Sequence, residues 1–184
     1  MAKVTTGKVR LSYPHLSKPR ENDDGTKKYT ATLLIPKEDS ATVKKIQNAI
    51  ADAAVEFREK NGQNSLPPKP SHTLHDGDKP RENGEAFGDE CKGCYVITVS
   101  SMNPPLCLDR QGNEALDLDT EFYAGCYIRA SINFKGYSVR GKKGITGYLN
   151  AIKKVSDGEP LGGARASAAD FDDGYEDEED DIFA

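Results

Sequence analysis

Apolar and polar residues alternate over residues 7–16, a period of two that is typical of a half-buried β-strand. The apolar side consists of Val9, Leu11 and Tyr13, and the polar side of Lys8, Arg10 and Ser12. Residues 28–35 form a second β-rich run that Pro36 ends, and the polar segment 21–25 lies between the two runs. We therefore predict an antiparallel pair of strands joined by a turn.

A helix is predicted after this pair, because apolar residues then recur at alternating intervals of three and four. This stripe consists of Val43, Ile46, Ile50, Ala53 and Phe57. Asp39 or Ser40 can cap the start of the helix, and Asn61-Gly62 can end it. Its other face is an ordinary mixture of charged residues, so we expect the helix to serve packing.

The middle of the chain is less regular. Residues 61–92 are rich in Pro, Gly, Asp and Asn and predict a long loop, and such loops are usually functional or mobile. A strand is predicted over 95–100, and Pro104-Pro105 interrupts it before a short apolar run at 106–108. A turn is predicted at 109–112 and a further short strand at 116–119.

Residues 122–156 contain seven basic residues and no acidic residue. Residues 127–137 alternate, with Ile128, Ala130, Ile132 and Phe134 on the predicted buried side. The other side interleaves cations and tyrosines with small polar residues. We expect a hairpin that turns at 141–144 and returns over 145–155, with a β-bulge where the alternation is imperfect.

Single-stranded nucleic acid offers phosphates and unstacked bases, which proteins bind with Lys or Arg along a groove and with exposed aromatic rings. The hairpin supplies both groups, with two more cations on the first strand. The candidate nucleic-acid-binding residues are Lys8, Arg10, Tyr127, Arg129, Lys135, Tyr137, Arg140, Lys142, Lys143, Tyr148, Lys153 and Lys154. The alternative is a solvated face whose edge lysines prevent aggregation.

The last fifteen residues, 170–184, hold nine carboxylates and no Lys or Arg, so they predict an exposed, disordered tail. The whole chain has a net charge of −5. The part before this tail has 25 basic and 21 acidic residues and is therefore mildly basic. Residues 157–169 are expected to be a flexible linker. The tail can compete with DNA for the basic hairpin, and its end, Asp180, Asp181, Ile182 and Phe183, is the candidate partner-binding segment.

Other chemistry has less support in the sequence. Cys91 and Cys94 have the spacing of half a zinc site, but Cys107 and Cys126 are too far apart to complete it. A metal site in the loop at His72, His75, Asp76 and Asp78 would mix hard and soft ligands. We expect no cofactor, no metal and no catalysis. No signal peptide or membrane span is predicted, so a cytoplasmic protein is expected.

Four segments resemble the OB-fold single-stranded DNA-binding proteins encoded by bacteriophages and prophages. They are TGKVRLSYPHL (6–16), YTATLLIPK (29–37), FYAGCYIRASINF (122–134) and GKKGITGYLNAIKKVSDGEPLGG (141–163). The resemblance implies a five-stranded barrel with a helix, and sequence-independent binding of single strands in phage replication or recombination. It also implies an acidic tail that docks proteins. The tail here ends Ile-Phe-Ala rather than Ile-Pro-Phe, which leaves its partner open.

We therefore predict a mainly β protein with an OB-like barrel over residues 1–156, one amphipathic helix, and a linker and acidic tail over 157–184. The predicted function is binding of single-stranded DNA, with replication or recombination proteins docking on the tail. One alternative is a zinc-dependent enzyme of nucleic-acid metabolism, and another is an OB-fold adaptor that does not bind DNA. A homodimer is left open, as are the number of nucleotides bound and the choice between DNA and RNA.

Overall fold

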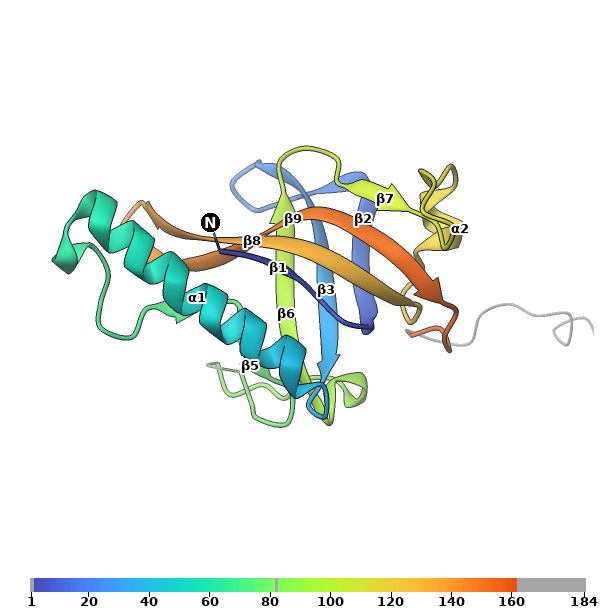
Figure 1. Ribbon diagram of the computed structural model, residues 1–184, viewed down its shortest axis with the longest axis horizontal. Coiled ribbons are helices and arrows are strands. Elements are labelled where there is room, and N and C mark those ends of the chain that lie inside the picture. The colour runs from blue at the N-terminus through green and yellow to red at the C-terminus, as the bar shows by residue number, and fades with distance from the viewer. Residues whose placement is uncertain (1, 82, 162–184) are drawn as a thin grey trace, which may run out of the picture.

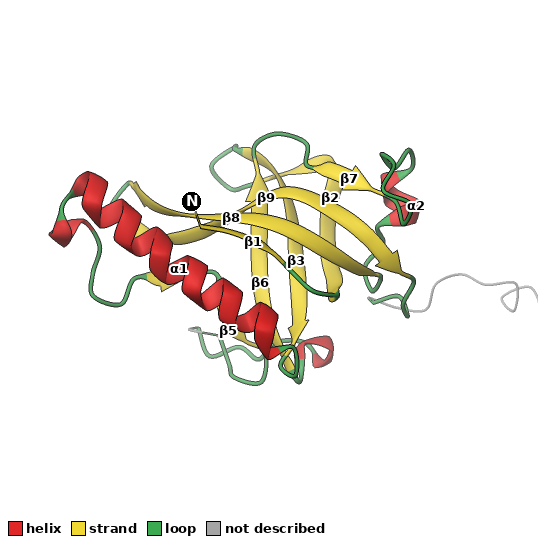
Figure 2. Ribbon diagram, viewed as in Figure 1, coloured by secondary structure: helices red, strands yellow, loops and turns green. Residues whose placement is uncertain are grey.

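The computed structural model describes residues 2–81 and 83–161, which form strands and one long helix (Figures 1 and 2). The strands are β1 (Ala2–Thr5), β2 (Val9–Glu21), β3 (Lys27–Pro36), β4 (Ser71–His72), β5 (Leu74–Asp76), β6 (Cys94–Ser101), β7 (Leu106–Leu108), β8 (Tyr127–Val139) and β9 (Lys142–Ser156). The helices are α1 (Ser40–Asn61) and α2 (Leu118–Glu121), with 3₁₀ turns at η1 (Gln63–Ser65) and η2 (Asp89–Cys91).

Five strands close into a barrel. β2 pairs with β3, β3 with β6, β6 with β9, β9 with β8, and β8 again with β2. β1 extends the sheet beside β8, and the short strands β4, β5 and β7 pair with β9 or β6. The predicted mainly β fold with an OB-like barrel is confirmed.

The barrel core is made by the predicted inward side chains. Ile128, Ala130, Ile132 and Phe134 of β8 are all buried, as are Val9 and Leu11 of β2. α1 packs against β1 and β8 and buries the predicted stripe, with Phe57 only partly covered (Figure 1). Asp39 caps α1 by accepting a hydrogen bond from the amide of Thr42, and the helix ends before Gly62.

Four local predictions need correction. Tyr13 does not face the core, because the β2–β3 register shifts between Ser12 and His15 and turns its ring outward. Residues 116–119 do not form a strand, since Asp117 instead caps the short helix α2. The hairpin turns at Arg140-Gly141, both with positive φ, rather than at 141–144. The long loop 61–92 also contains β4 and β5.

The segment after β9 is not free linker from its first residue. The amide of Leu161 donates to the carbonyl of Ala124, and the hydroxyl of Tyr123 donates to the carbonyl of Gly158. Residues 157–161 therefore pack against the barrel, and a linker can begin only after them. The acidic tail, including Asp180, Asp181, Ile182 and Phe183, lies outside the described residues. Within the described ranges, no helix is long and apolar enough to span a bilayer.

Candidate nucleic-acid interface

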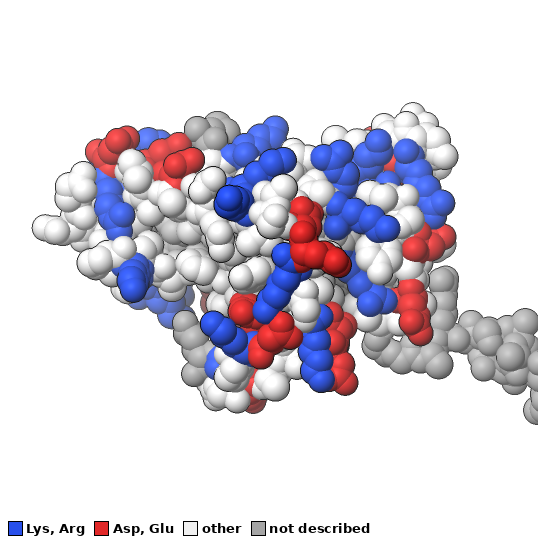
Figure 3. Space-filling model, turned by 60° about the horizontal axis from the view of Figure 1, so that its bottom comes forward, with Lys and Arg blue, Asp and Glu red and all other residues white. Residues whose placement is uncertain are grey.

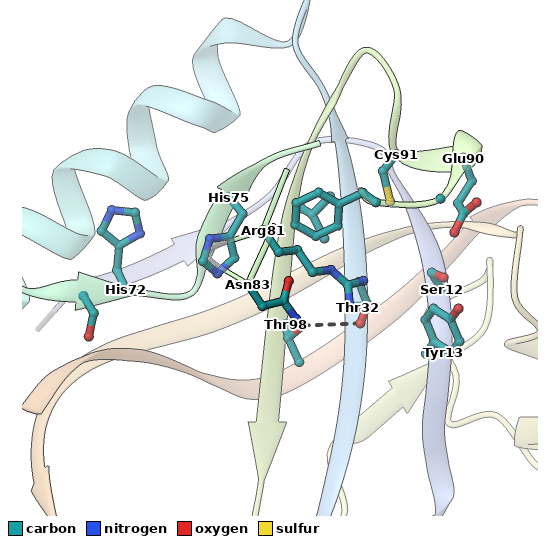
Figure 4. Close-up of a pocket in the computed structure, with 14 residues that line it drawn as sticks. Ser12, Tyr13, Thr32, His72, His75, Arg81, Asn83, Glu90, Cys91 and Thr98 are labelled. Carbon is teal, nitrogen blue, oxygen red and sulfur yellow. Dashed lines mark hydrogen bonds between the residues drawn. The ribbon is translucent and has the colours of Figure 1, made fainter. Parts of the chain in front are cut away.

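A groove lies on the outer face of β2, β3 and β6, opposite the barrel core. Its floor contains Ser12, Thr32 and Thr98, which are joined by strand register from β2 to β3 to β6. The hydroxyls of Thr32 and Thr98 lie 3.4 Å apart (Figure 4). Small hydroxyl side chains in this position leave room above the sheet and offer hydrogen bonds without negative charge.

The wall of the groove comes from the loop between α1 and β6. His72, His75, Arg81 and Phe87 line it, and the cavity has a volume of about 600 Å³ (Figure 4). The Arg81 guanidinium lies 4.7 Å from the centre of the Phe87 ring, and the His75 ring lies 6.3 Å from the same ring. Cationic and aromatic groups are thus already arranged together beside the hydroxyl floor, as binding of single-stranded nucleic acid requires.

Tyr13 adds an exposed aromatic ring to the opposite side of the groove. It is 67% exposed and its φ is +43°, a left-handed conformation that is rare for a residue with a side chain. Pro14 follows it at the bulge in β2, so the chain is turned where the ring projects. A strained backbone that holds a large ring in solvent is typical of a binding site.

The loop that forms the wall is tied to the barrel. The Lys37 ammonium lies 2.6 Å from carboxylate oxygens of both Asp76 and Asp78. These ion pairs lower the pKa of both carboxyls and raise the pKa of Lys37. Asp78 also accepts a hydrogen bond from the amide of Gly93, so the middle of the loop is held to its end.

The surroundings of His72 in the groove wall favour its neutral imidazole. The pKa of His72 is lowered, first by neighbouring protein atoms that disfavour the cation and then by the charge of nearby His75. The two rings lie 6.5 Å apart. A phosphate placed beside them would favour protonation of His72, so binding of a polyanion and a fall in pH should support each other.

Several predicted site residues meet at one end of the groove, next to Ser12. The Lys8 ammonium lies 4.6 Å from the centre of the Tyr127 ring, and the Arg10 guanidinium lies 5.8 Å from it. Arg10 also donates to backbone carbonyls of Gly125 and Glu159, so part of its role is to hold residues 157–161. Tyr127 is partly covered and is not the freely exposed ring that the alternation predicted.

Arg129 and Lys153 are exposed and directly paired across β8 and β9. Because two like charges face each other here, an anion bound between them would relieve their repulsion. Figure 3 shows basic side chains gathered toward the end of the molecule where β9 ends, whereas acidic and basic side chains mix over the lower part of that view. The excess of positive charge is therefore local.

The hairpin places cations at the other end of the groove. Arg140 lies in the turn, and Lys142 and Lys143 are exposed at the start of β9. Gly144 pairs with Tyr137 on one side and with Ser71 of β4 on the other, which brings Tyr137 beside the groove wall. The hairpin and the Lys8–Arg10 cluster thus flank the groove.

Two other predicted residues lie apart from this cavity. Tyr148 is half-buried on the outer face of β9, where it pairs with Asn133 of β8 and Ser100 of β6. Lys135 lies beside the end of α1 with Glu56 and Glu59, around a separate hollow of about 490 Å³. The structure therefore does not bring Lys135 to the groove.

The prediction that Lys154 contacts nucleic acid is wrong. It is 3% exposed, its ammonium donates to the carbonyl of Glu121, and it lies 3.0 Å from the carboxylate of Asp157 and 5.0 Å from the centre of the Tyr123 ring. Adjacent residues of a strand face opposite sides, so Lys153 and Lys154 cannot both face outward. Lys154 closes the end of the barrel and is unavailable to a ligand.

The candidate metal ligands do not converge. Among residues 2–81 and 83–161, no three His, Cys, Asp or Glu side chains form a cluster that could hold a metal ion. Asp76 and Asp78 are taken up by Lys37. Burial raises the pKa of all four cysteine thiols, to about 11 for Cys107 and Cys126, so their reactive thiolate forms are disfavoured at neutral pH.

Sequence reasoning missed most of the groove itself. The groove residues that were not predicted to bind nucleic acid are Ser12, Tyr13, Thr32, His72, His75, Arg81, Phe87 and Thr98, of which His72 and His75 were considered only as metal ligands. The alternation in β3 and β6 contained a usable signal, because it places Thr32 and Thr98 on the outer face. Nothing local indicates that the loop returns over that face, since the loop has no periodicity.

Comparisons with known proteins place this chain in a family. A family model described as Enterobacter phage Enc34, ssDNA-binding protein matches residues 2–183. The "Putative protein p50" of Acyrthosiphon pisum secondary endosymbiont phage 1 is 31% identical over 192 residues, which cover 99% of each chain. The first finding names a binding function for the family, and the second places a relative in another phage.

Solved structures with the same fold include two phage proteins. The single-stranded DNA-binding protein from bacteriophage Enc34 in complex with ssDNA has a TM-score of 0.75 and 29% identity, covering 88% of this chain and 90% of that chain. Gp2.5, a single-stranded DNA binding protein encoded by bacteriophage T7, has a TM-score of 0.60 at 14% identity, covering 91% and 99%, which is a likeness of fold alone. This chain belongs to the family of the Enterobacter phage Enc34 ssDNA-binding protein.

Proposed function

We propose that the protein binds single-stranded DNA without sequence preference, along the groove on β2, β3 and β6, and that it performs no catalysis. The observation that carries this proposal is the groove itself: a floor of hydroxyls, a wall with Arg81 on Phe87, and an exposed Tyr13. Aromatic rings can stack on any base, and cations can follow the phosphates of any sequence. Family membership supports the same ligand.

Salt dependence tests the contribution of the flanking cations. Each phosphate contact on a single strand contributes about −0.7 to the slope of log affinity against log salt. Replacing Lys142 and Lys143 by Ala should therefore reduce the slope for poly-dT by about 1 to 1.5. The same double change at Lys44 and Lys45, which are exposed on α1, is the matched control and should leave the slope unchanged.

An unchanged slope in the hairpin variant would remove the hairpin from the interface. No salt-dependent binding to poly-dT by the full chain would refute the function and favour a protein adaptor. A poly-rU competitor in the same titration measures the preference between DNA and RNA. Zinc in the purified protein, measured by mass spectrometry, would instead favour the metal-enzyme alternative.

We infer a second role for the acidic tail, from the sequence alone. Nine carboxylates tethered to the barrel compete with DNA phosphates for the same cations, because tethering raises their effective concentration. DNA then releases Ile182 and Phe183 to dock a replication or recombination protein of the phage or its host. The expected division is a barrel over 1–156, joined through the packed residues 157–161 to linker and tail.

The tail proposal is tested by truncation after Leu161, which keeps residues 157–161 that pack on the barrel. The truncated protein should bind DNA more tightly than the full chain, most clearly at low salt where charges are least screened. Phe183→Ala should lose the protein partner while DNA affinity stays the same. Equal DNA affinity of the full and truncated proteins at low salt would contradict the competition.

A further inference from the structure

One row of side chains continues beyond the groove around the outside of the barrel. Strand register joins these residues one to the next, from β1 through β8, β9, β6 and β3 to β2. They are Lys3, Asn133, Tyr148, Ser100, Thr30 and His15. Directly paired residues on adjacent strands lie side by side on the same face, so the row is continuous.

The row has the chemical character of the groove floor. All six side chains are polar, none is acidic and none is fully buried. Thr30 and Ser100 lie two residues along their strands from Thr32 and Thr98, so this half of the row runs beside the groove. The other half carries the Tyr148 ring, and it ends at exposed Lys3 on the edge strand β1.

Asn133, in the middle of the row, has an unmet hydrogen bond. Its side-chain nitrogen donates to Asn150 at 3.3 Å, but its side-chain oxygen is buried and has no partner among the described residues. Buried acceptors are nearly always paired in proteins, and an exception calls for a missing partner. A donor group on a bound base would supply that partner once the side chains that cover the oxygen moved aside.

We propose that single-stranded DNA leaves the groove over Ser100 and continues across Tyr148 and Asn133 to Lys3. The inference rests on the proposed DNA-binding function and extends its site to a second half. The four strands from β6 to β1 lie about 4.8 Å apart and give a path of about 14 Å beyond the groove, enough for a few more nucleotides. Tyr148 stacks on a base in this half, and Lys3 pairs with a phosphate.

The test is the affinity of the full chain for dT oligonucleotides of increasing length, measured by fluorescence anisotropy at one salt concentration. Tyr148→Ala combined with Lys3→Ala should leave affinity for the shortest bound oligonucleotide nearly unchanged. It should weaken binding to a 20-nucleotide strand about tenfold or more, because each lost stack alone has an effect of that order. Tyr148→Phe keeps the ring and should bind like wild type.

A change in the groove, Tyr13→Ala, should in contrast weaken binding at every length. Lys45→Ala on α1 is the control for loss of one exposed charge. Equal affinity of the Tyr148 and Lys3 double variant and the wild type at all lengths would overturn the second half while leaving the groove intact. If instead Tyr13→Ala leaves DNA affinity unchanged and the double variant weakens it, the groove is not part of the DNA-binding site.

Discussion

Replacement of Tyr13 separates binding from stability. The ring is 67% exposed, so its removal costs only about a third of the 3–5 kcal/mol lost with a buried aromatic, or about 1–1.7 kcal/mol of unfolding free energy. If the ring stacks on a base, Tyr13→Ala should cost about 1–3 kcal/mol of binding, which is a loss of affinity between about 5-fold and 150-fold. Tyr13→Phe keeps the ring and is the control.

The backbone gives a second, independent readout at the same position. Tyr13 has a φ of +43°, which costs a residue with a Cβ about 1–2 kcal/mol and costs glycine almost nothing. Glycine also loses about 0.5–1 kcal/mol more entropy on folding. Tyr13→Gly should therefore be more stable than Tyr13→Ala, by up to about 1.5 kcal/mol, while binding DNA equally weakly.

Affinity is measured by anisotropy with a dT oligonucleotide at fixed salt, and stability by urea unfolding. Wild-type affinity in Tyr13→Ala would refute the stacking role, whatever the stability. A Tyr13→Gly variant clearly less stable than Tyr13→Ala would show that the backbone is not strained. A loss of affinity in Tyr13→Phe would show that the hydroxyl, rather than the ring, makes the contact with DNA.

Three further predictions concern the supports of the site. The pKa of His72 in the folded protein lies below its ordinary value of 6.5, so as the pH falls the unfolded chain takes up this proton before the folded one does. The free energy of unfolding should therefore fall as the pH drops below about 6.5. Urea unfolding between pH 7 and 5 should show a weaker pH dependence for His72→Gln than for the wild type. Gly144→Ala would place its Cβ 2.7 Å from the carbonyl oxygen of Ser71, so it should displace β4 and weaken DNA affinity more than a conservative surface change does. Lys154→Met should lower the free energy of unfolding by about 1–3 kcal/mol, because it leaves the Glu121 carbonyl without its hydrogen-bond donor. It should not change the salt slope of poly-dT binding. A reduced slope would show that Lys154 does contact DNA.

The elements with a clear local period were predictable from the sequence. The inward side of β8 and the stripe of α1 follow from alternation and from spacings of three and four, because each depends only on neighbours in the same element. The charge separation between body and tail likewise needs only the composition. The prediction of a barrel and of single-stranded DNA as the ligand came from the resemblance of four segments to a phage family. The fold and the family membership agree with this prediction.

The tertiary structure alone decided where the site lies. Tyr13 faces outward because a bulge shifts the register of β2, and Lys154 faces inward because a carbonyl and a carboxylate meet it at the barrel end. The groove joins Ser12, Thr32 and Thr98 with Arg81 and Phe87 of a loop that has no period. A sequence determines which side of a strand a residue occupies, whereas pairing between distant strands decides which residues become neighbours on that side.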